Sequence, residues 1–580
     1  MKILLVAVNA KYIHSNLAVY SLKAYAKEYR ENISIAEYTI NNLPEEILKG
    51  IYKEQADVIA FSCYIWNITL VTLLVTEIRK LQPEVKIWFG GPEVSYDPKE
   101  CLKKVPALDG IVIGEGERTF YELTKFYVDG SGELSLIKGL AYKNSGTTHN
   151  NKDTMEITLA PGRELLDLDE IPFPYGDMEM FRNKIVYYES SRGCPYSCSY
   201  CLSSVERGVR FRSIGLIKQE LQIFLDNKVA QVKFVDRTFN CKKSHAMEIW
   251  QYIRENDNGI TNFHFEVMAD LFQDKELDFL ALLRPGQVQL EIGVQTTNAD
   301  TVKAIHRSMD FKRLSDNVIR IGKGHNIHQH LDLIAGLPSE DFAAFSDSFN
   351  QVYRLKPDQL QIGFLKVLKG SPMEEESRAC GIVHQDAPPY EILYTAQLSY
   401  PELLKLKGVC MMVETYYNSG QFDYSIWYLE HFFDTPMQLY LDLYDYFEEN
   451  GLDLIPHSKI RKYEILLDFY MVKVIKLKME ASENLVSLFG EILYLDLCFQ
   501  EVVKNRPVFA PEPVAPEKLH KIRRSLNLPR NQAAIEHFTY DVQTSALTGS
   551  STPMERLLLF DYTCRDPINN HAKVTVVEII

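Results

Sequence analysis

Hydrophobic and polar positions follow two periods along the first 130 residues. Short runs that are almost wholly apolar, such as KILLVAV at 2–8, predict strands buried on both faces. Amphipathic stretches between them, such as LAVYSLKAYAKEY at 17–29, predict helices. Apolar strands that alternate with helices indicate a parallel sheet with helices on both sides. The remaining strands of this sheet are expected at 33–40, 57–66, 85–91 and 110–117.

Three loops follow strands of this sheet and are the expected ligand-binding positions. SCYIWN (62–67) follows the third strand, GGPEVS (90–95) the fourth, and GEGE (114–117) the fifth. Ligands of open α/β sheets bind beyond the carboxyl ends of the strands. A ligand site is therefore expected where these three loops meet.

A second series of strands and helices begins at residue 185. Its six strand–helix repeats predict a parallel barrel or part-barrel with its site at the carboxyl ends of the strands. The segment before it, 131–183, is irregular, with a small hairpin expected at its start and a linker rich in prolines and acidic residues after it. The strands of the second series are expected at 185–194, 232–236, 263–269, 288–295, 330–338 and 360–367.

After about residue 390 the hydrophobic spacing becomes helical, as in MQLYLDLYDYFEENG (437–451) and KYEILLDFYMVKVIKL (462–477). The end of the chain carries short strand-like pieces, HFTYDV and VTVVEII. The sequence predicts an α/β multidomain protein. Its expected parts are a Rossmann-like domain at 1–135, a linker with a small hairpin at 136–183, a partial (β/α)6 TIM barrel at 184–390 and a mainly α-helical domain at 391–580.

The composition is that of a globular protein with an acidic balance. The 580 residues are 46% hydrophobic and carry a formal net charge of −15. This balance disfavours a large phosphate-binding surface, although KIRRSLNLPR (521–530) is a local basic stretch. The start lacks a cleavage-site pattern, and no apolar run approaches the roughly 20 residues that span a bilayer. A cytoplasmic protein with reduced thiols and no membrane partner is expected.

Three of the ten cysteines lie in one short stretch, SSRGCPYSCSYCLSS at 190–204. A disulfide framework requires an even number of cysteines and an oxidising compartment. Zinc sites usually bring paired CxxC segments or a Cys/His set, and neither accompanies this stretch. Three thiolates on one loop suit an iron–sulfur cluster with one iron left open, with zinc as the alternative. Cys194, Cys198 and Cys201 are therefore the candidate metal ligands.

The C-x3-C-x2-C spacing, with an aromatic residue before the third cysteine, resembles the radical S-adenosylmethionine (SAM) superfamily. VKFVDRTFN (232–240), LEIGVQT (290–296) and DLIAGLPSE (332–340) resemble later strands of that family's barrel. The resemblance implies a [4Fe–4S] cluster that binds SAM and cleaves it to a 5′-deoxyadenosyl radical. It also implies an electron donor such as flavodoxin or ferredoxin. Further cofactor contacts are expected from Tyr200, Asp236, Gly293, Gln295 and Leu337, with turn capping as the alternative role of Asp236.

A parallel α/β domain ahead of such a barrel resembles the cobalamin-binding domain of cobalamin-dependent radical SAM proteins. The helical tail resembles an uncharacterised C-terminal extension found on some of these proteins. The resemblance places cobalamin at the strand-end loops. The residues expected to contact it are Ser62, Tyr64, Trp66, Asn67, Gly90, Gly91, Glu93, Gly114, Glu115 and Gly116.

One departure from the cobalamin-binding pattern bears on the cobalt. Domains that ligate cobalt use a D-x-H-x-x-G segment after the first strand, whereas this chain has NAKYIHSNLAVY there, with His14 nearby. Cobalamin is therefore expected to bind without a protein histidine on cobalt, with Tyr64, Trp66 or Asn67 nearest the metal. Core packing is the alternative role of Tyr64 and Trp66.

The expected reaction is methyl transfer from methylcobalamin to a carbon from which the adenosyl radical has removed hydrogen. A radical rearrangement or cyclisation with the same cofactors is one alternative. A tRNA-modifying enzyme like the methylthiotransferases is another, although those enzymes carry three more cluster cysteines in the N-terminal domain, where this chain has only Cys63 and Cys101. The substrate is thus expected to be a small molecule, a peptide or RNA.

Overall fold

The computed structural model of the chain describes residues 1–144, 156–205, 208–475, 483–525 and 532–577. The chain forms two compact units. The first comprises Met1–Glu291, Val302–Asp310 and Phe364–Ala396, and the second comprises Ile292–Thr301, Phe311–Gly363 and Gln397–Ile580.

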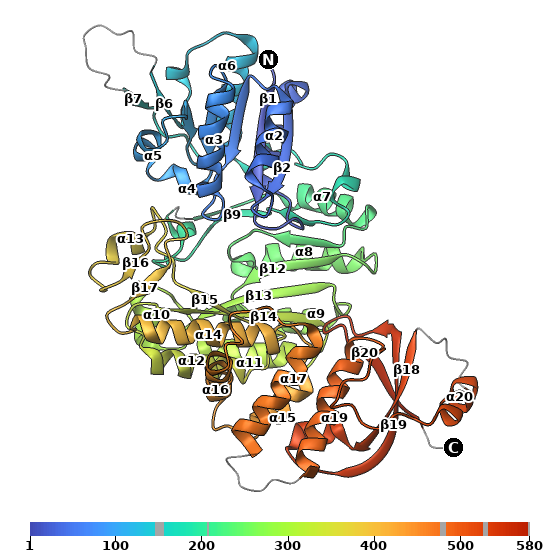
Figure 1. Cartoon of the computed structure of the whole chain (residues 1–580). Helices are drawn as coiled ribbons and strands as arrows, with labels where there is room; N and C mark the ends of the chain where they lie inside the picture. The colour runs from blue at the N-terminus through green and yellow to red at the C-terminus, as the bar shows by residue number, and fades with distance from the viewer. Residues whose placement is uncertain (145–155, 206–207, 476–482, 526–531, 578–580) are drawn as a thin grey trace. The chain divides into compact units, whose positions relative to one another are not determined.

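A seven-stranded sheet of order β2-β1-β3-β4-β5-β6-β7 begins the first unit (Figure 1). Strands β1 to β5 are parallel, as the sequence predicts. All seven residues of β1 are buried, because helices α2, α3 and α5 pack on one face of the sheet and α1 and α6 on the other. The strands are β1 (Ile3–Asn9), β2 (Ile33–Thr39), β3 (Val58–Ser62), β4 (Lys86–Gly90), β5 (Gly110–Val112), β6 (Leu140–Lys143) and β7 (Ile157–Leu159). The helices are α1 (Leu17–Tyr25), α2 (Pro44–Glu54), α3 (Ile68–Leu81), α4 (Pro92–Ser95), α5 (Pro98–Lys104) and α6 (Glu117–Asp129).

The hairpin expected in the linker is part of this sheet. β6 pairs antiparallel with β5, and β7 pairs antiparallel with β6. The first sheet thus continues to Leu159, beyond the boundary expected at residue 135. Residues 145–155, between the two strands, lie outside the described residues.

A six-stranded sheet of order β15-β14-β13-β12-β11-β8 follows, with consecutive strands as neighbours and helices between them in the sequence. Alternate residues of β13 are buried, so one face of this sheet packs in the core and the other carries polar side chains such as Glu291. The boundary between the two units passes along β13. The strands are β8 (Ile185–Tyr188), β11 (Gln231–Phe234), β12 (Asn262–Val267), β13 (Val288–Gln295), β14 (Ile327–Ala335) and β15 (Gln359–Phe364). The helices are α7 (Ile214–Asp226), α8 (Lys243–Glu255), α9 (Asp274–Leu280), α10 (Ala299–Ala304), α11 (Phe311–Gly322) and α12 (Phe342–Tyr353).

The strand expected at 185–194 is two strands. β8 ends at Tyr188, and β9 (Ser191–Cys194) leaves the sheet to pair antiparallel with β10 (Gly208–Phe211). Gly193 has a φ of 100°, and a Cβ there would collide with the carbonyl oxygen of Gly208. Only glycine therefore fits this position beside the first cysteine. After β15 come α13 (Pro372–Glu376) and the short pair β16 (Val383–His384) and β17 (Ile392–Tyr394).

The C-terminal part of the second unit is mainly helical, as expected, but it ends in an antiparallel sheet of order β18-β19-β20. The central strand, β19 (Pro553–Arg565), was not predicted because charged residues flank its short apolar run. The helix expected at 462–477 ends at Phe469 and continues as a π-helical turn to Ile475. The elements are α14 (Tyr400–Tyr416), α15 (Asp423–Glu430), α16 (Pro436–Glu449), α17 (Lys459–Phe469), α19 (Glu483–Gln500), α20 (Pro516–Ser525), β18 (Ala533–Tyr540), α21 (Val542–Thr548), β19 and β20 (Ala572–Val577).

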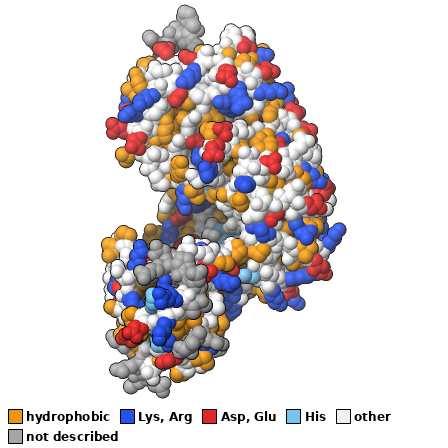
Figure 2. Space-filling view, turned by 90° about the vertical axis from the view of Figure 1, so that its right-hand side faces the viewer, with side chains coloured by type: hydrophobic (Ala, Val, Ile, Leu, Met, Phe, Trp, Pro, Cys, Tyr) orange, Lys and Arg blue, Asp and Glu red, His pale blue; other side chains and the backbone are white. Residues whose placement is uncertain are grey.

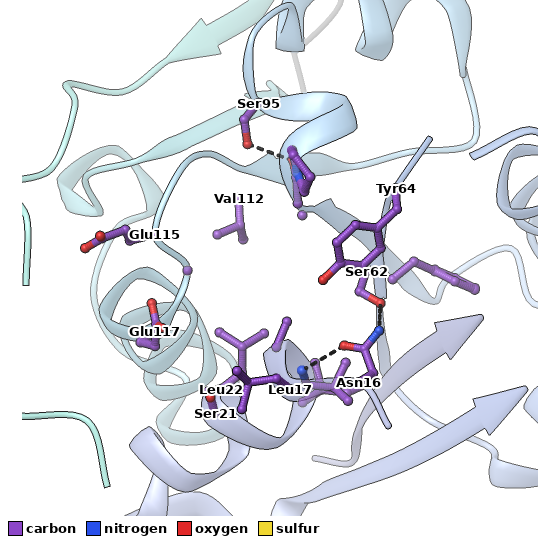
Figure 3. Close-up of a pocket in the computed structure, with 18 of the residues that line it drawn as sticks. Asn16, Leu17, Ser21, Leu22, Ser62, Tyr64, Ser95, Val112, Glu115 and Glu117 are labelled. Carbon is purple, nitrogen blue, oxygen red and sulfur yellow. Dashed lines mark hydrogen bonds between the residues drawn. The ribbon is translucent and has the colours of Figure 1, made fainter. Parts of the chain in front are cut away.

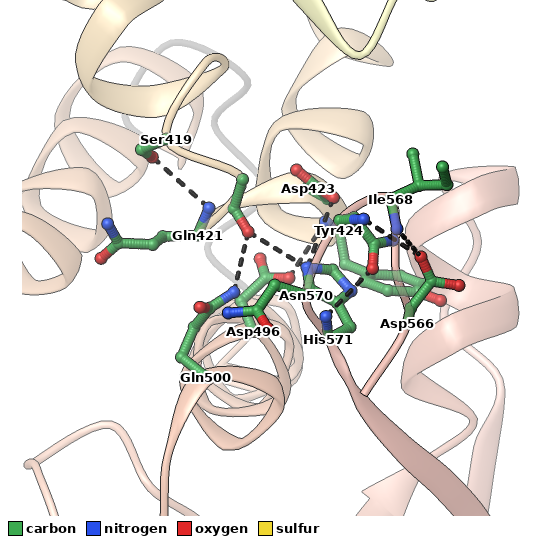
Figure 4. Close-up of polar contacts among 12 residues, drawn as sticks. Ser419, Gln421, Asp423, Tyr424, Asp496, Gln500, Asp566, Ile568, Asn570 and His571 are labelled. Atoms are coloured by element: carbon green, nitrogen blue, oxygen red, sulfur yellow. Dashed lines mark hydrogen bonds and ion pairs between the residues drawn. The ribbon is translucent and has the colours of Figure 1, made fainter. Parts of the chain in front are cut away.

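A buried carboxylate joins two of these helices (Figure 4). Asp496 of α19 is 1% exposed and accepts hydrogen bonds from the backbone N–H groups of Tyr424 and Ser425 at 3.1 and 2.8 Å. The Ser425 hydroxyl donates to the same carboxylate at 2.6 Å. Since the first turn of a helix has unpaired N–H groups, Asp496 completes the N-terminus of α15 from a neighbouring helix.

None of the described helices is both long and apolar enough to cross a membrane. On the face drawn in Figure 2, Lys and Arg side chains lie among those of Asp and Glu, and its described part forms no continuous basic surface. The basic stretch at 521–530 begins on α20, and its residues 526–530 lie outside the described residues.

Candidate active site

The three cysteines of the motif share one braced loop in the first unit. Cys194 is the last residue of β9, while Cys198 is buried and Cys194 and Cys201 are partly exposed. The backbone N–H of Ser199 donates to the carbonyl oxygen of Ile305 at 3.0 Å, and that of Met373 donates to the carbonyl oxygen of Ser199 at 2.9 Å. The loop is therefore fixed by segments distant in sequence.

Polar partners of these thiols fit the anionic state that an iron cluster requires. Burial raises the pKa of the Cys198 thiol, and Arg307, whose Nη1 lies 3.8 Å from Sγ, acts in the opposite direction. Thr238 places its hydroxyl 3.5 Å from Cys194 Sγ. The predicted neighbour Tyr200 lies on this loop and is partly buried. Sequence reasoning missed Arg307 and Thr238, since nothing in their local pattern marks them.

The carboxylate of Asp236, an expected SAM contact, lies against the start of β9. Its side chain is 1% exposed and accepts hydrogen bonds from the hydroxyls of Ser190 and Ser191 at 2.6 and 2.5 Å. The Ser190 backbone N–H donates to it at 3.0 Å. Burial raises the pKa of Asp236 to about 6, while these donors act in the opposite direction. Asp236 thus fixes the start of β9, an arrangement that agrees with the turn-capping alternative, while its contact with SAM stays a prediction.

A pocket of about 720 Å³ lies at the carboxyl ends of β1, β3, β4 and β5 (Figure 3). Asn16, Ser62 and Tyr64 border one side, and Glu115 and Glu117 border the other. Residues at the ends of the barrel strands complete the lining, namely Tyr187, Glu189, Arg192, Val235 and Arg237. The pocket is thus shared by the N-terminal domain and the part of the barrel that carries the cysteine loop.

The inner part of the pocket is an apolar slot between the sheet and helices α1 and α6. Leu5, Val19, Leu22, Val112 and Phe120 line it. Such a slot fits a flat aromatic base like that of the cobalamin nucleotide tail. At the rim, Gly91 has a φ of 113°, and a Cβ there would lie 2.5 Å from the carbonyl oxygen of Cys63. The strand-end loops are also tied together, because Ser95 Oγ donates to Gly91 O and accepts from Gly114 N.

Most of the residues expected to contact cobalamin line this pocket, and two do not. Asn67 is fully buried, where its amide donates to the carbonyl oxygens of Val8 and Ser62 at 3.0 and 2.9 Å. Glu93 pairs instead with Lys369 at 2.9 Å and accepts from the Tyr390 hydroxyl. Both therefore shape the loops from behind. The expected residues that do line the pocket are Ser62, Tyr64, Trp66, Gly90, Gly91, Gly114, Glu115 and Gly116.

Two aromatic contacts shape the pocket mouth. Tyr64 and Trp66 stack with ring centroids 4.3 Å apart, and both line the pocket rather than packing in the core. His14 Nδ1 lies 2.7 Å from the Tyr187 hydroxyl of β8, and burial, Lys11 and Lys233 lower the pKa of His14. His14 therefore links the loop after β1 to the barrel through a neutral ring, a contact that the sequence does not reveal.

The glutamates of the GEGE loop bind arginines of the cysteine hairpin. Arg192 on β9 lies 3.2 Å from Glu115, 2.8 Å from Glu117 and 2.7 Å from Glu189. Arg210 on β10 also pairs with Glu115. Burial alone would raise the pKa of Glu115, but Arg210 and Arg192 hold it below its ordinary value. We call these five residues the glutamate–arginine network, and it joins a wall of the pocket to the strand that carries Cys194.

Three of the expected SAM contacts belong to the second unit. Gln295 ends β13 with a φ of 72°, and its buried Oε1 has no hydrogen-bond partner among the described residues. Gly293 lies on the same strand, at a partly exposed position. Leu337 is fully buried beyond the end of β14. The Gln295 oxygen suits a ligand, whereas the Leu337 side chain packs in the core.

Comparisons with known proteins agree with this geometry. The family model for the B12 binding domain matches residues 3–124, and that for the radical SAM superfamily matches residues 188–352. The chain joins a B12-binding domain to a radical SAM domain. These two domain types are the ones that hold cobalamin and a [4Fe–4S] cluster with SAM. Residues 379–560 match a protein of unknown function, DUF4080, which is the C-terminal extension.

Several curated proteins are similar to about half of this chain. An uncharacterised methyltransferase of Pyrococcus horikoshii is 28% identical over 45% of this chain and 56% of its own length. The cobalamin-dependent radical SAM methyltransferase TokK of Streptomyces tokunonensis is 24% identical over 57% of this chain and 49% of its own. An anaerobic magnesium-protoporphyrin IX monomethyl ester cyclase of Synechocystis is 25% identical over 50% of this chain and 58% of its own length. The chain thus spans about half the length of the curated relatives it matches.

Solved structures share the fold. The cobalamin-dependent SAM radical enzyme OxsB with aqua-cobalamin bound superposes with a TM-score of 0.59 and 16% identity over 86% of this chain and 79% of that one. The methyltransferase TsrM of Kitasatospora setae, with cobalamin and a [4Fe–4S] cluster bound, superposes with a TM-score of 0.54 and 16% identity over 67% of this chain and 79% of that one.

Proposed function

We propose that this radical SAM enzyme transfers a methyl group to an unactivated carbon of a small-molecule substrate. The observation that carries the proposal is the glutamate–arginine network, which attaches the cobalamin pocket to the cysteine hairpin within one compact unit. The radical formed at the cluster would remove hydrogen from the substrate, and the resulting carbon radical would have to meet the methyl group of cobalamin before it meets solvent. The two sites therefore need a fixed separation.

The bound cofactors supply a 5′-deoxyadenosyl radical and a methyl group for a carbon radical. The residues of the chain hold and orient them. Cys194, Cys198 and Cys201 would hold the cluster, whose remaining iron would bind SAM. The apolar slot beside α1 holds the nucleotide tail, and Tyr64 and Trp66 form an aromatic wall at the mouth. No histidine on cobalt is assigned, in line with the missing D-x-H-x-x-G segment.

A direct experiment measures the products of anaerobically reconstituted protein supplied with SAM labelled in its methyl group. Methyl transfer of this kind consumes two SAM molecules, so S-adenosylhomocysteine and 5′-deoxyadenosine should form in equal amounts, with the label in the product. Absence of label from every product, with cobalamin bound, would contradict the proposal.

A cyclisation or rearrangement is the second candidate, and it is favoured by the similarity to the Synechocystis cyclase. It would give 5′-deoxyadenosine without S-adenosylhomocysteine, so the same product ratio separates the two. The proposed electron donor is a flavodoxin or ferredoxin, and the proposed location is the cytoplasm. The methylthiotransferase-like alternative has less support, because those enzymes carry three further cluster cysteines in the N-terminal domain, where this chain has only Cys63 and Cys101.

A further inference from the structure

Arg237 lies between two residues that are fixed to the cysteine hairpin. Asp236 holds the hydroxyls of Ser190 and Ser191, and the Thr238 hydroxyl lies 3.5 Å from Cys194 Sγ. The backbone on both sides of Arg237 is therefore anchored. Its own side chain is exposed and lines the pocket. A cation is thus presented to the pocket one residue away from a contact of a cluster ligand.

This cation stands outside the ion pairs of the pocket wall. The other arginine of the lining, Arg192, is held by the carboxylates of the glutamate–arginine network. In the part of the chain that the structure describes, no hydrogen bond or ion pair involves the Arg237 guanidinium. Its positive charge acts on Tyr64, another lining residue: burial raises the pKa of the Tyr64 hydroxyl to about 12, and Arg237 acts in the opposite direction. Arg237 is thus a positive group facing a cavity with its donors unused.

We propose that Arg237 binds an anionic group of the substrate, a carboxylate, phosphate or phosphonate, and so holds the reacting carbon between the cluster and cobalamin. A guanidinium offers a planar pair of donors that matches such groups and binds them in two contacts. The proposal rests on the proposed function, since that function places the substrate between the two cofactors. The proposal adds the chemical class of the substrate. Because the chain carries a net charge of −15, an anionic substrate needs a local positive charge at its binding site.

The cofactors carry anionic groups of their own, and the geometry favours the substrate over them. The slot that fits the nucleotide tail lies between α1, α6 and the sheet, where Leu5, Val19 and Phe120 line it. Arg237 instead follows β11 of the barrel and lines the same pocket as Tyr64. The carboxylate of SAM is expected on the open iron. Arg237 is therefore available to bind the substrate.

The experiment uses holoenzyme reconstituted with the cluster, cobalamin and SAM, and methylphosphonate as the probe. Binding is measured by ³¹P NMR titration for the wild type, for Arg237→Gln and for Arg118→Gln. Arg118 is the matched control, since it is an exposed arginine on α6 with one pair to Glu122 at 3.6 Å. We expect Arg237→Gln to weaken probe binding by about 10- to 100-fold, the usual effect of losing a charged hydrogen-bond donor. Arg118→Gln should bind the probe like the wild type.

Two results would overturn the inference. One is equal probe affinity for Arg237→Gln and the wild type. The other is loss of cobalamin or SAM from Arg237→Gln, measured by absorbance and equilibrium dialysis, since the arginine would then hold a cofactor. Neither result depends on methyl transfer, so a failed proposed function leaves this test intact.

A second arm identifies the class of the natural substrate. A metabolite extract is separated on an anion exchanger, and each fraction is incubated with holoenzyme and SAM carrying a CD3 group. We expect the labelled product in the retained fraction and a KM raised about tenfold or more by Arg237→Gln. A labelled product confined to the unretained fraction would contradict the anionic class while supporting methyl transfer.

Discussion

The glutamate–arginine network and the buried carboxylate of Asp496 in the C-terminal part both contain buried ionisable groups, but these groups have opposite roles. In the network, Glu115, Glu117 and Glu189 converge on Arg192 beside an open cavity. In the C-terminal part, Asp496 is enclosed and its carboxylate accepts three hydrogen bonds from the start of α15. Figure 4 shows the one donated by Tyr424. A buried charge beside a cavity can hold or orient a ligand, whereas an enclosed one with satisfied hydrogen bonds stabilises the fold. Substitutions in the first region should alter chemistry, and those in the second should alter stability.

The largest effect is expected from Cys198→Ala. Removing one of three thiolates leaves the cluster without a full ligand set, so 5′-deoxyadenosine formation should fall to background while the protein stays folded. Iron and sulfide content, together with 5′-deoxyadenosine by chromatography, measure this. Cys564→Ala is the control, because Cys564 is exposed on β19 and should leave both quantities unchanged. Normal SAM cleavage by Cys198→Ala would remove the basis for the assigned cluster.

A smaller effect on chemistry is expected from Arg192→Met. It leaves the carboxylates of Glu115, Glu117 and Glu189 facing one another at a partly buried position, and breaking such a pair costs about 3 kcal/mol. Cobalamin affinity should fall about 100-fold, as measured by absorbance after gel filtration at graded cobalamin concentrations. Arg192→Lys keeps the charge and should recover part of the affinity. Unchanged affinity in Arg192→Met would show that the network does not position the pocket.

The sequence predicts what depends on local pattern and misses what depends on pairing across the fold. Hydrophobic periodicity places β1 and α1 within a few residues, and cysteine spacing identifies the cluster loop. Arg192 and Tyr187 carry no such local mark, because their roles come from partners far along the chain, Glu117 and His14. Burial of a polar residue is equally hidden from the sequence, since Asn67 of a predicted ligand loop is fully buried. The predicted domain boundaries stay predictions.

In the C-terminal part, Asp496→Ala should change stability and leave chemistry unchanged. It leaves two backbone N–H groups and a hydroxyl without their acceptor, at a cost of about 3–5 kcal/mol. Urea unfolding followed by far-ultraviolet circular dichroism should show the loss, with Asp347→Ala, an exposed site on α12, as the control. The amount of 5′-deoxyadenosine per cluster should match the wild type at 20 °C. A large fall in that ratio would mean that Asp496 and its hydrogen-bond partners take part in the reaction.

The smallest effect is expected from Glu340→Gln, and its sign depends on pH. Glu340 is 1% exposed, accepts from the Thr296 hydroxyl at 2.5 Å, and burial raises its pKa to about 7. A carboxyl whose pKa is higher in the folded state than in the unfolded chain contributes stability below the unfolded value, near 4.3, and loses it as pH rises through 7.

The glutamine variant keeps an uncharged group at this position at every pH. Compared with the wild type it should therefore be equally stable at pH 4.5 and more stable at pH 8.5, by on the order of 2–3 kcal/mol. Urea unfolding at the two pH values measures the difference, and Asp347→Asn should show none of it. A variant that is less stable than the wild type at pH 8.5 would show that Glu340 is ionised and held by its hydroxyl donors. In that case Glu340 would resemble Glu115 of the network, whose pKa is held down by its partners. An enclosed carboxyl group would then behave like one beside the cavity, and the contrast between enclosed and cavity-facing groups would not hold for Glu340.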